Sequence, residues 1–217
     1  MRRLALPIVA LSAFLIFVAA CGGDGDSNGG GDSNGGGDSN GGEEPAVPFA
    51  ESCQKTDEKQ FAAPPERIID TGKQYIATIS TQKGDIVLEL FSDTPVTTNN
   101  FVFLACKGYY DGLTFHRVEP NFVIQGGDPT GTGGGGPGYS IPDEDDGDHQ
   151  MDQGVISMAK AGPNTTGSQF FIAIGPRETV GHLDPDFTVF GRVTAGMDVA
   201  EQIAIGDSFD TIVIEER

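Results

Sequence analysis

Three short segments of the 217-residue chain gather most of the side chains that could take part in chemistry, and they are residues 115–128, 131–134 and 157–172. The first segment combines aromatic rings and a terminal amide with Arg117, its only charged donor. No serine or cysteine stands in a constellation that would make it a nucleophile. The histidines do not have the spacing of metal ligands, and they are His116, His149 and His182. The segments therefore give no support to covalent or metal-dependent chemistry, and we expect no metal and no cofactor.

In this order and spacing, the three segments together resemble the cyclophilin family, and the resemblance extends from about residue 75 to residue 214. It implies a peptidyl-prolyl cis-trans isomerase, an enzyme that accelerates rotation about Xaa-Pro peptide bonds. Its implied partners are proline-containing peptides and unfolded exported proteins. No bond is made or broken in this reaction, so the resemblance implies no cofactor.

Rotation about a peptide bond is slow because amide resonance has to be broken, at a cost of about 18–20 kcal/mol. In the twisted state the prolyl nitrogen regains its lone pair and accepts a hydrogen bond, for which a charged, forked donor is well suited. The enzyme also needs an apolar slot for the proline ring. By the resemblance, Arg117 is the donor, and the catalytic residues are Arg117, Phe122 and Gln125. The implied substrate-binding residues line the slot or contact the extended peptide, and they are Val123, Gly131, Ala159, Lys160, Ala161, Gln169, Phe171, His182, Leu183 and Phe187.

Three positions depart from the pattern common in the family. His182 stands where many members have tryptophan, Phe187 where they have histidine, and Lys160 where asparagine is frequent. We expect His182 to be a wall residue rather than a proton shuttle, because the reaction transfers no proton, and Lys160 to contribute mainly its backbone. The departures leave catalysis in place and weaken any inference of tight cyclosporin binding. For Phe122 and Phe171, plain barrel core is the alternative role.

Branched and alternating residues separated by turn signals predict eight short strands that position these segments. The predicted strands are residues 75–81, 85–90, 114–118, 122–125, 155–158, 170–174, 188–193 and 211–214. Thr94 as N-cap and Pro95 begin a helix that Gly108 ends, and a second helix covers residues 197–204. The elements predict an all-β fold with two helices, in which a closed eight-stranded antiparallel barrel is capped by helices at its ends. The resemblance implies that this barrel is cyclophilin-like.

The N-terminal residues have the pattern of a bacterial lipoprotein. Residues 1–20 combine two arginines with an apolar run shorter than the roughly 20 residues of a spanning helix, which predicts a signal peptide. Cys21 follows small residues and resembles the acylated cysteine of a lipobox; the alternative is an ordinary signal peptide in which Cys21 is incidental. Residues 21–45 form the lipidated cysteine and a flexible spacer, residues 46–72 an extended lead-in, and residues 73–217 the isomerase domain. We therefore expect a lipid-anchored, extracytoplasmic protein at the cell membrane.

Two cysteines remain once Cys21 is assigned to the lipid, and an even pair in an oxidising compartment favours a disulfide. We expect Cys53 of the lead-in to pair with Cys106, near the end of the first helix. Such a bridge would pin the lead-in against the barrel. The alternative is two unpaired thiols, with Cys106 buried.

The net charge of -19 argues against nucleic acid as a partner, because no basic stripe is present to neutralise phosphates. The same charge repels anionic membranes, so membrane contact depends on the N-terminal lipid. Residues 131–136 fit G-x-G-x-x-G, but Pro137 and Gly138 follow at once and leave no helix N-terminus for a phosphate. We expect a flexible loop there, at the rim of the site, and a solvated loop at the acidic residues 143–148.

Two functions of other classes compete with the enzyme. A tethered binding module would grip proline-containing segments without turnover, and a surface scaffold would need an apolar patch that the sequence does not show. The presence of Arg117, Phe122, Gln125 and Phe171 favours the enzyme, which we expect to act as a monomer.

Overall fold

The computed structural model describes residues 49–56 and 58–217, which belong to one compact unit. The predicted signal peptide, Cys21, the spacer and the first residues of the predicted lead-in lie outside the described residues. Among the helices of the described part, none is long and apolar enough to cross a membrane.

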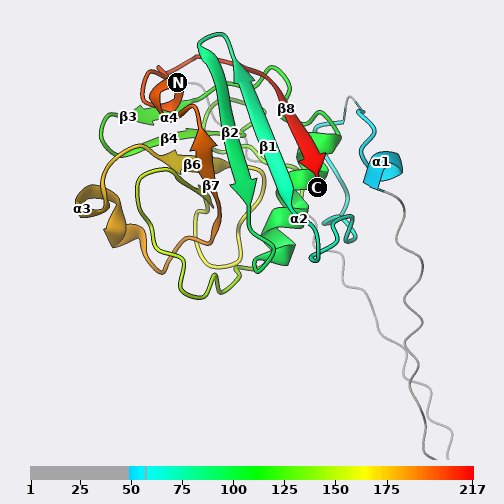
Figure 1. Cartoon of the computed structure of the whole chain (residues 1–217). Helices are drawn as coiled ribbons and strands as arrows, with labels where there is room; N and C mark the ends of the chain where they lie inside the picture. Colours follow the sequence, from blue (N-terminus) through cyan, green and yellow to red (C-terminus); the bar gives the residue numbers. More distant parts are fainter. Residues whose placement is uncertain (1–48, 57) are drawn as a thin grey trace, which may run out of the picture. The chain divides into compact units, whose positions relative to one another are not determined.

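Eight antiparallel strands form one sheet in the order β3-β4-β6-β5-β7-β2-β1-β8 (Figure 1). Their bounds are β1 Tyr75–Thr81, β2 Gly84–Leu90, β3 Arg117–Glu119, β4 Val123–Gly126, β5 Val155–Met158, β6 Phe170–Ala173, β7 Val189–Ala195 and β8 Phe209–Glu216. All eight predicted strands are present, and β1 and β5 have the predicted bounds. The two long strands β1 and β2 form the predicted hairpin, with β8 on the other side of β1.

The prediction of a closed barrel was wrong, because the sheet is an open half-barrel. Within the described part, the edge strands β3 and β8 do not pair as a ladder, and a single bridge, Thr114 to Ser208, joins the segments that precede them. The β3 strand has only three residues, so it offers few backbone groups for a ladder with β8. The gap is crossed by loop contacts such as the Phe115 N–H donating to the carbonyl oxygen of Asp207 at 2.9 Å.

The structure has more helices than the two that were predicted, and most of them are short. They are α1 Phe49–Ser52, α2 Pro95–Cys106, α3 Arg177–Val180, η1 Gly181–Leu183 and α4 Met197–Ala200. Helix α2 begins at Pro95 as expected and is largely buried against the main core. Helix α4 ends four residues before the predicted second helix does. The remaining helices are single turns, which lack the repeating apolar pattern that reveals a longer helix.

The N-terminus of α2 is capped by a residue far away in the sequence. Thr94 makes no capping hydrogen bond, contrary to expectation. Instead, the Glu144 carboxylate accepts the N–H groups of Val96 at 2.9 Å and Thr97 at 2.6 Å, where a negative charge also complements the helix dipole. Asp146 likewise accepts a backbone N–H at the start of β7. Asp145 and Asp148 are exposed, as expected of a solvated loop, whereas Glu144 and Asp146 are bonded to other elements of the fold.

Two apolar clusters lie on opposite faces of β4 and β6, because successive strand residues point to opposite sides. Ile124, Phe170 and Ile172 belong to the main core inside the half-barrel. Val123 and Phe171 belong to a second, smaller cluster on the outer face. The strands are thus apolar on both faces, and the outer face is the one available to a ligand.

Cys53 and Cys106 are joined in a disulfide, with their Cα atoms 4.4 Å apart. Beside it, the Thr56 N–H donates to the carbonyl oxygen of Lys107 at 2.9 Å. The lead-in is therefore held against the end of α2, in the arrangement that the predicted pairing requires.

Candidate active site

Arg117 stands on the short edge strand β3, opposite Gln125 of β4. Its Nε and Nη2 donate to Oε1 of Glu119 at 2.9 and 2.7 Å, and its Nη1 donates to Oε1 of Gln125 at 3.2 Å. The guanidinium carbon lies 5.7 Å from the centre of the Phe122 ring. These contacts orient the planar fork beside an aromatic face while the side chain stays exposed. A guanidinium has five N–H bonds, so donors remain for a ligand.

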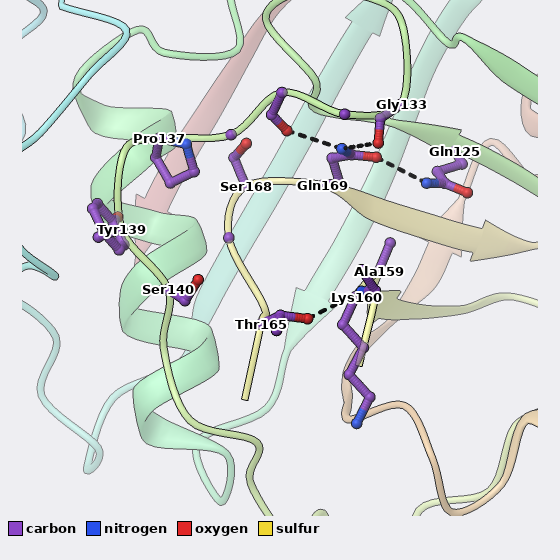
Figure 2. Close-up of a pocket in the computed structure, with 15 residues that line it drawn as sticks. Gln125, Gly133, Pro137, Tyr139, Ser140, Ala159, Lys160, Thr165, Ser168 and Gln169 are labelled. Carbon is purple, nitrogen blue, oxygen red and sulfur yellow. Dashed lines mark hydrogen bonds between the residues drawn. The ribbon is translucent and has the colours of Figure 1, made fainter. Parts of the chain in front are cut away.

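A chain of side-chain hydrogen bonds runs from Arg117 to the glycine-rich loop. Gln125 Nε2 donates to Oε1 of Gln169 at 3.0 Å, and Gln169 Nε2 donates to the carbonyl oxygens of Gly133 and Gly135 at 2.9 Å each. Figure 2 shows Gln169 lying between Gly133 and Gln125. The two predicted glutamines therefore connect the charged donor to the loop, and each fixes the orientation of the next.

The second apolar cluster forms a slot beside Arg117. Phe171 is buried at its base and meets the Phe187 ring edge-on, with the centroids 5.6 Å apart. The Phe122 and His182 rings stack in parallel but offset, with their centroids 5.6 Å apart and an interplanar angle of 4°. The other predicted members of the cluster are Val123, Ala159 and Leu183. The structure thus gathers apolar residues from β4, β6, η1 and the loops after β5 and η1. The His182 ring is exposed beside Phe122, and its role as a wall residue stays a prediction.

A pocket of about 320 Å³ adjoins this slot at Ala159, and the Gln125 and Gln169 side chains line it. Its lining combines predicted site residues with the glycine-rich loop (Figure 2), and it consists of Gln125, Gly133, Gly134, Gly135, Gly136, Pro137, Tyr139, Ser140, Ala159, Lys160, Ala161, Thr165, Gly167, Ser168 and Gln169. Gly131 does not line the pocket; it is an exposed turn residue whose N–H donates to the Asp128 carbonyl. A role for Gly131 in binding substrate stays a prediction.

The backbone of residues 159–161 is only partly available to a peptide. The Ala159 N–H donates to the carbonyl oxygen of Gln169 at 2.9 Å, and the Ala161 N–H donates to Oγ1 of Thr165 at 3.0 Å. Within the described residues, the N–H of Lys160 has no such partner. Pairing with an extended substrate therefore falls to the Lys160 N–H and to the carbonyl groups.

The Lys160 side chain has contacts of its own, although its backbone was expected to matter most. Its ammonium pairs with Asp143 at 2.7 Å and lies 5.7 Å from the centre of the Phe187 ring. Only 14% of the side chain is exposed. Lys160 therefore joins the pocket to the apolar slot at their common edge.

Asp128 holds the loop that was expected to be flexible. Its Oδ1 accepts the N–H of Thr130 at 2.7 Å, and its Oδ2 accepts the N–H of Gly133 at 2.6 Å. Burial alone would raise the pKa of Asp128, but hydrogen bonds from Thr130 and from the Gly133 and Gly135 backbone outweigh it and hold the pKa at about 2. Gly135 is also required sterically, because a Cβ atom there would lie 2.1 Å from Oδ1 of Asp128.

Several residues of the site were not identified from the sequence. Met151 is fully buried in the second cluster, yet it lies in a segment with no strand or helix pattern. Asp128 could have been identified by the Asp-Pro-Thr sequence, which is typical of a turn closed by the aspartate side chain. His116 lies beside Gly133, and burial lowers its pKa, which favours a neutral ring at neutral pH. No sequence signal pairs Asp143 with Lys160.

Comparison with known proteins gives consistent matches. The family model described as "Cyclophilin type peptidyl-prolyl cis-trans isomerase/CLD" matches residues 76–216. Peptidyl-prolyl cis-trans isomerase B of Bacillus subtilis is 49% identical over 132 residues, covering 60% of this chain and 90% of that protein. Peptidyl-prolyl cis-trans isomerase ppi1 of Schizosaccharomyces pombe is 48% identical over 132 residues, covering 58% of this chain and 83% of that protein. A crystal structure of a Cryptosporidium parvum cyclophilin-type isomerase in the presence of the dipeptide Ala-Pro matches with a TM-score of 0.60 and 36% identity, covering 65% of this chain and 99% of that chain.

Proposed function

The chain belongs to the cyclophilin-type peptidyl-prolyl cis-trans isomerases, and from that premise we propose that it assists the folding of exported proteins at the outer face of the cell membrane. Its substrates are Xaa-Pro bonds in unfolded or extended polypeptides. A lipid on Cys21 holds it at the membrane, and the spacer of residues 21–45 lets the isomerase domain reach polypeptides that emerge there.

The observation that carries the assignment of the site is the convergence of Arg117 and Gln125 beside the Phe122–Phe171 slot. The slot holds the proline ring, and a remaining N–H group of Arg117 donates a hydrogen bond to the prolyl nitrogen. This bond strengthens as the amide twists, since only then does the nitrogen carry a localised lone pair. Catalysis requires such preferential binding of the transition state. Glu119 and Gln125 keep the guanidinium in place, so little reorganisation accompanies the reaction.

The polypeptide on either side of the proline lies along the backbone of residues 159–161 and over the adjoining pocket. A related Cryptosporidium parvum structure, which was determined in the presence of the dipeptide Ala-Pro, supports a peptide as the ligand. The Lys160 N–H and neighbouring carbonyls supply strand-like pairing, while Gln169 and the glycine-rich loop form the wall.

Two features support an extracytoplasmic setting. The Cys53–Cys106 disulfide is of the kind that persists in oxidising compartments. The lipobox-like sequence before Cys21, followed by the Gly-rich spacer, is typical of a tethered lipoprotein.

The anchoring is tested by expressing the wild type and Cys21→Ser in a bacterial host with labelled fatty acid. We expect the wild type to fractionate with membranes and carry the label, and Cys21→Ser to lose both. Ser27→Ala, a change in the spacer, is the matched control and should behave as the wild type. A wild-type protein found free and unlabelled would rule out the lipid anchor without bearing on isomerase activity.

A further inference from the structure

The outer side of the glycine-rich loop, residues 133–138, is contacted by the lead-in, which precedes the residues 76–216 matched by the family model. We propose that residues 58–61 of the lead-in, here termed the strap, position this loop so that it can bind peptides that extend beyond the proline slot. Gln60 and Phe61 are then positioning residues for long substrates. The inference rests on the proposed assignment of the adjoining pocket to substrate.

Two hydrogen bonds attach the strap to the loop. Gln60 Nε2 donates to the carbonyl oxygen of Gly136, and the Phe61 N–H donates to that of Pro137, both at 2.7 Å. The approach is so close that a Cβ atom on Gly138 would lie 2.8 Å from the carbonyl oxygen of Phe61, and Gly138 also has a φ of +93°. Glycine at this position therefore permits the contact between the two backbones.

The Phe61 ring extends the attachment to a residue that lines the pocket. It lies with its centroid 5.3 Å from that of Phe103 on α2 and 6.4 Å from that of Tyr139. Tyr139 lines the pocket, and its hydroxyl donates to Oδ1 of Asn100 at 2.7 Å. Phe61 thus packs between α2 and the pocket wall, and a shift of the strap would move that wall.

The loop is a partition between two hollows. The pocket on one side is lined by Gln169, and an open hollow on the other side is lined by Gln60. The two hollows share five lining residues, which are Gly134, Gly135 and Gly136 of the loop and Tyr139 and Ser140 directly after it. Gln169 holds the partition from the pocket side, and the strap holds it from the other. A peptide confined to the proline slot does not touch the partition, whereas a longer peptide does.

The strap is held in place from its N-terminal side before any peptide binds. The Cys53–Cys106 disulfide and the hydrogen bond from Thr56 to Lys107 fix the preceding residues to the end of α2. Because the loop is already ordered, the binding of a long peptide costs less conformational entropy.

The test uses the whole chain and two probes, a blocked Xaa-Pro dipeptide, which the proline slot can hold, and a ten-residue peptide with the same Xaa-Pro at its centre. Gln60→Ala removes the donor, and Gln60→Glu replaces it with an acceptor of nearly the same shape. We expect both variants to weaken binding of the long peptide by about threefold to tenfold, the loss of one hydrogen bond. Binding of the dipeptide and the exchange rate at saturation should not change, because Arg117 and Gln125 stay in place.

Gln54→Ala and Gln54→Glu are the matched controls, since Gln54 is exposed in the same lead-in and has no hydrogen bond to the loop within the described residues. Equal losses for both peptides, no loss for either, or the same loss in the Gln54 variants would overturn the inference. A wild type that accelerates exchange in neither peptide would instead overturn the assignment of the site. Thermal unfolding of each variant separates loss of fold from loss of binding.

Discussion

The two faces of β4 and β6 differ in what covers them. On the inner face, Phe170 and Ile172 are completely buried in the main core. On the outer face, Phe171 is also buried, but the smaller cluster around it includes partly exposed residues outside the sheet, such as Leu183 of η1 and Phe187 of the loop that follows. One pair of strands therefore supplies both a closed core and a slot that a proline ring can enter.

The comparison separates stability from function at neighbouring positions. A residue on the inner face has contacts on every side, so its removal leaves a cavity that the barrel cannot close. A residue on the outer face lies under loops that can relax into the space. A substitution on the inner face should therefore mainly lower the free energy of unfolding, whereas a substitution at the adjacent position on the outer face should mainly weaken peptide binding.

Phe170→Ala and Phe171→Ala test this difference directly, and the first should have the largest effect of all. We expect Phe170→Ala to lower the free energy of unfolding by about 3–5 kcal/mol, as measured by urea denaturation. Phe171→Ala should cost about 1–3 kcal/mol, because its surroundings are less constrained, and should weaken peptide binding at least tenfold. Equal losses of stability in the two variants, with peptide affinity unchanged in Phe171→Ala, would mean that the outer cluster is part of the structural core and does not bind proline.

The Cys53–Cys106 disulfide should contribute to stability but not to catalysis, like the residues of the inner face. It closes a long loop between the lead-in and the end of α2, with a sequence separation of 53. We expect reduction, or the double variant Cys53→Ser, Cys106→Ser, to lower the free energy of unfolding by about 4 kcal/mol, the value that the chain-entropy model gives for a loop of this length. The exchange rate of bound peptide at saturation should be unaffected. A lower exchange rate with an unchanged free energy of unfolding would mean that the disulfide supports catalysis rather than stability.

The strands and most of the site could be predicted because their signals are local. Branched residues located β1 and β2, and matched segments identified Arg117, Gln125 and Phe171, which the structure brings together beside one slot. Closure of the barrel was mispredicted, since whether β3 pairs with β8 depends on edges far apart in the sequence, and local patterns do not record their register.

Polar contacts between residues far apart in the chain could not be predicted from the sequence either. Thr94 looked like the cap of α2, but Glu144, 48 residues beyond Val96, occupies that place. The glycine-rich loop looked flexible because its composition permits many conformations. Its order comes from the Asp128 and Gln169 side chains, whose partners only the fold reveals.

Acid should affect the loop at the active site in a defined range. The folded state holds the pKa of Asp128 at about 2, below its ordinary value of 3.8, so the folded state favours the ionised carboxylate. The resulting stabilisation, on the order of 2 kcal/mol, is complete above about pH 4 and is lost as the pH falls toward 2. Asp128→Asn should lack this contribution, so the difference in unfolding free energy from the wild type should shrink over that range. A difference independent of pH between 4 and 2 would contradict the assignment.

The central claim is that Arg117 accelerates isomerisation by bonding the prolyl nitrogen of the twisted amide. Two variants frame its test. In Arg117→Lys the rate should also be poor, because an ammonium does not reproduce the planar fork. In His182→Phe the rate should change little, since that ring packs on Phe122 and transfers no proton.

The most direct measurement is therefore NMR exchange between the cis and trans forms of an Xaa-Pro peptide, with its affinity measured in parallel, for the wild type and Arg117→Ala. We expect the wild type to accelerate exchange, and Arg117→Ala to cut the rate at saturation at least tenfold with a smaller change in affinity. A near wild-type rate in Arg117→Ala would move the catalytic role to another residue and contradict the account.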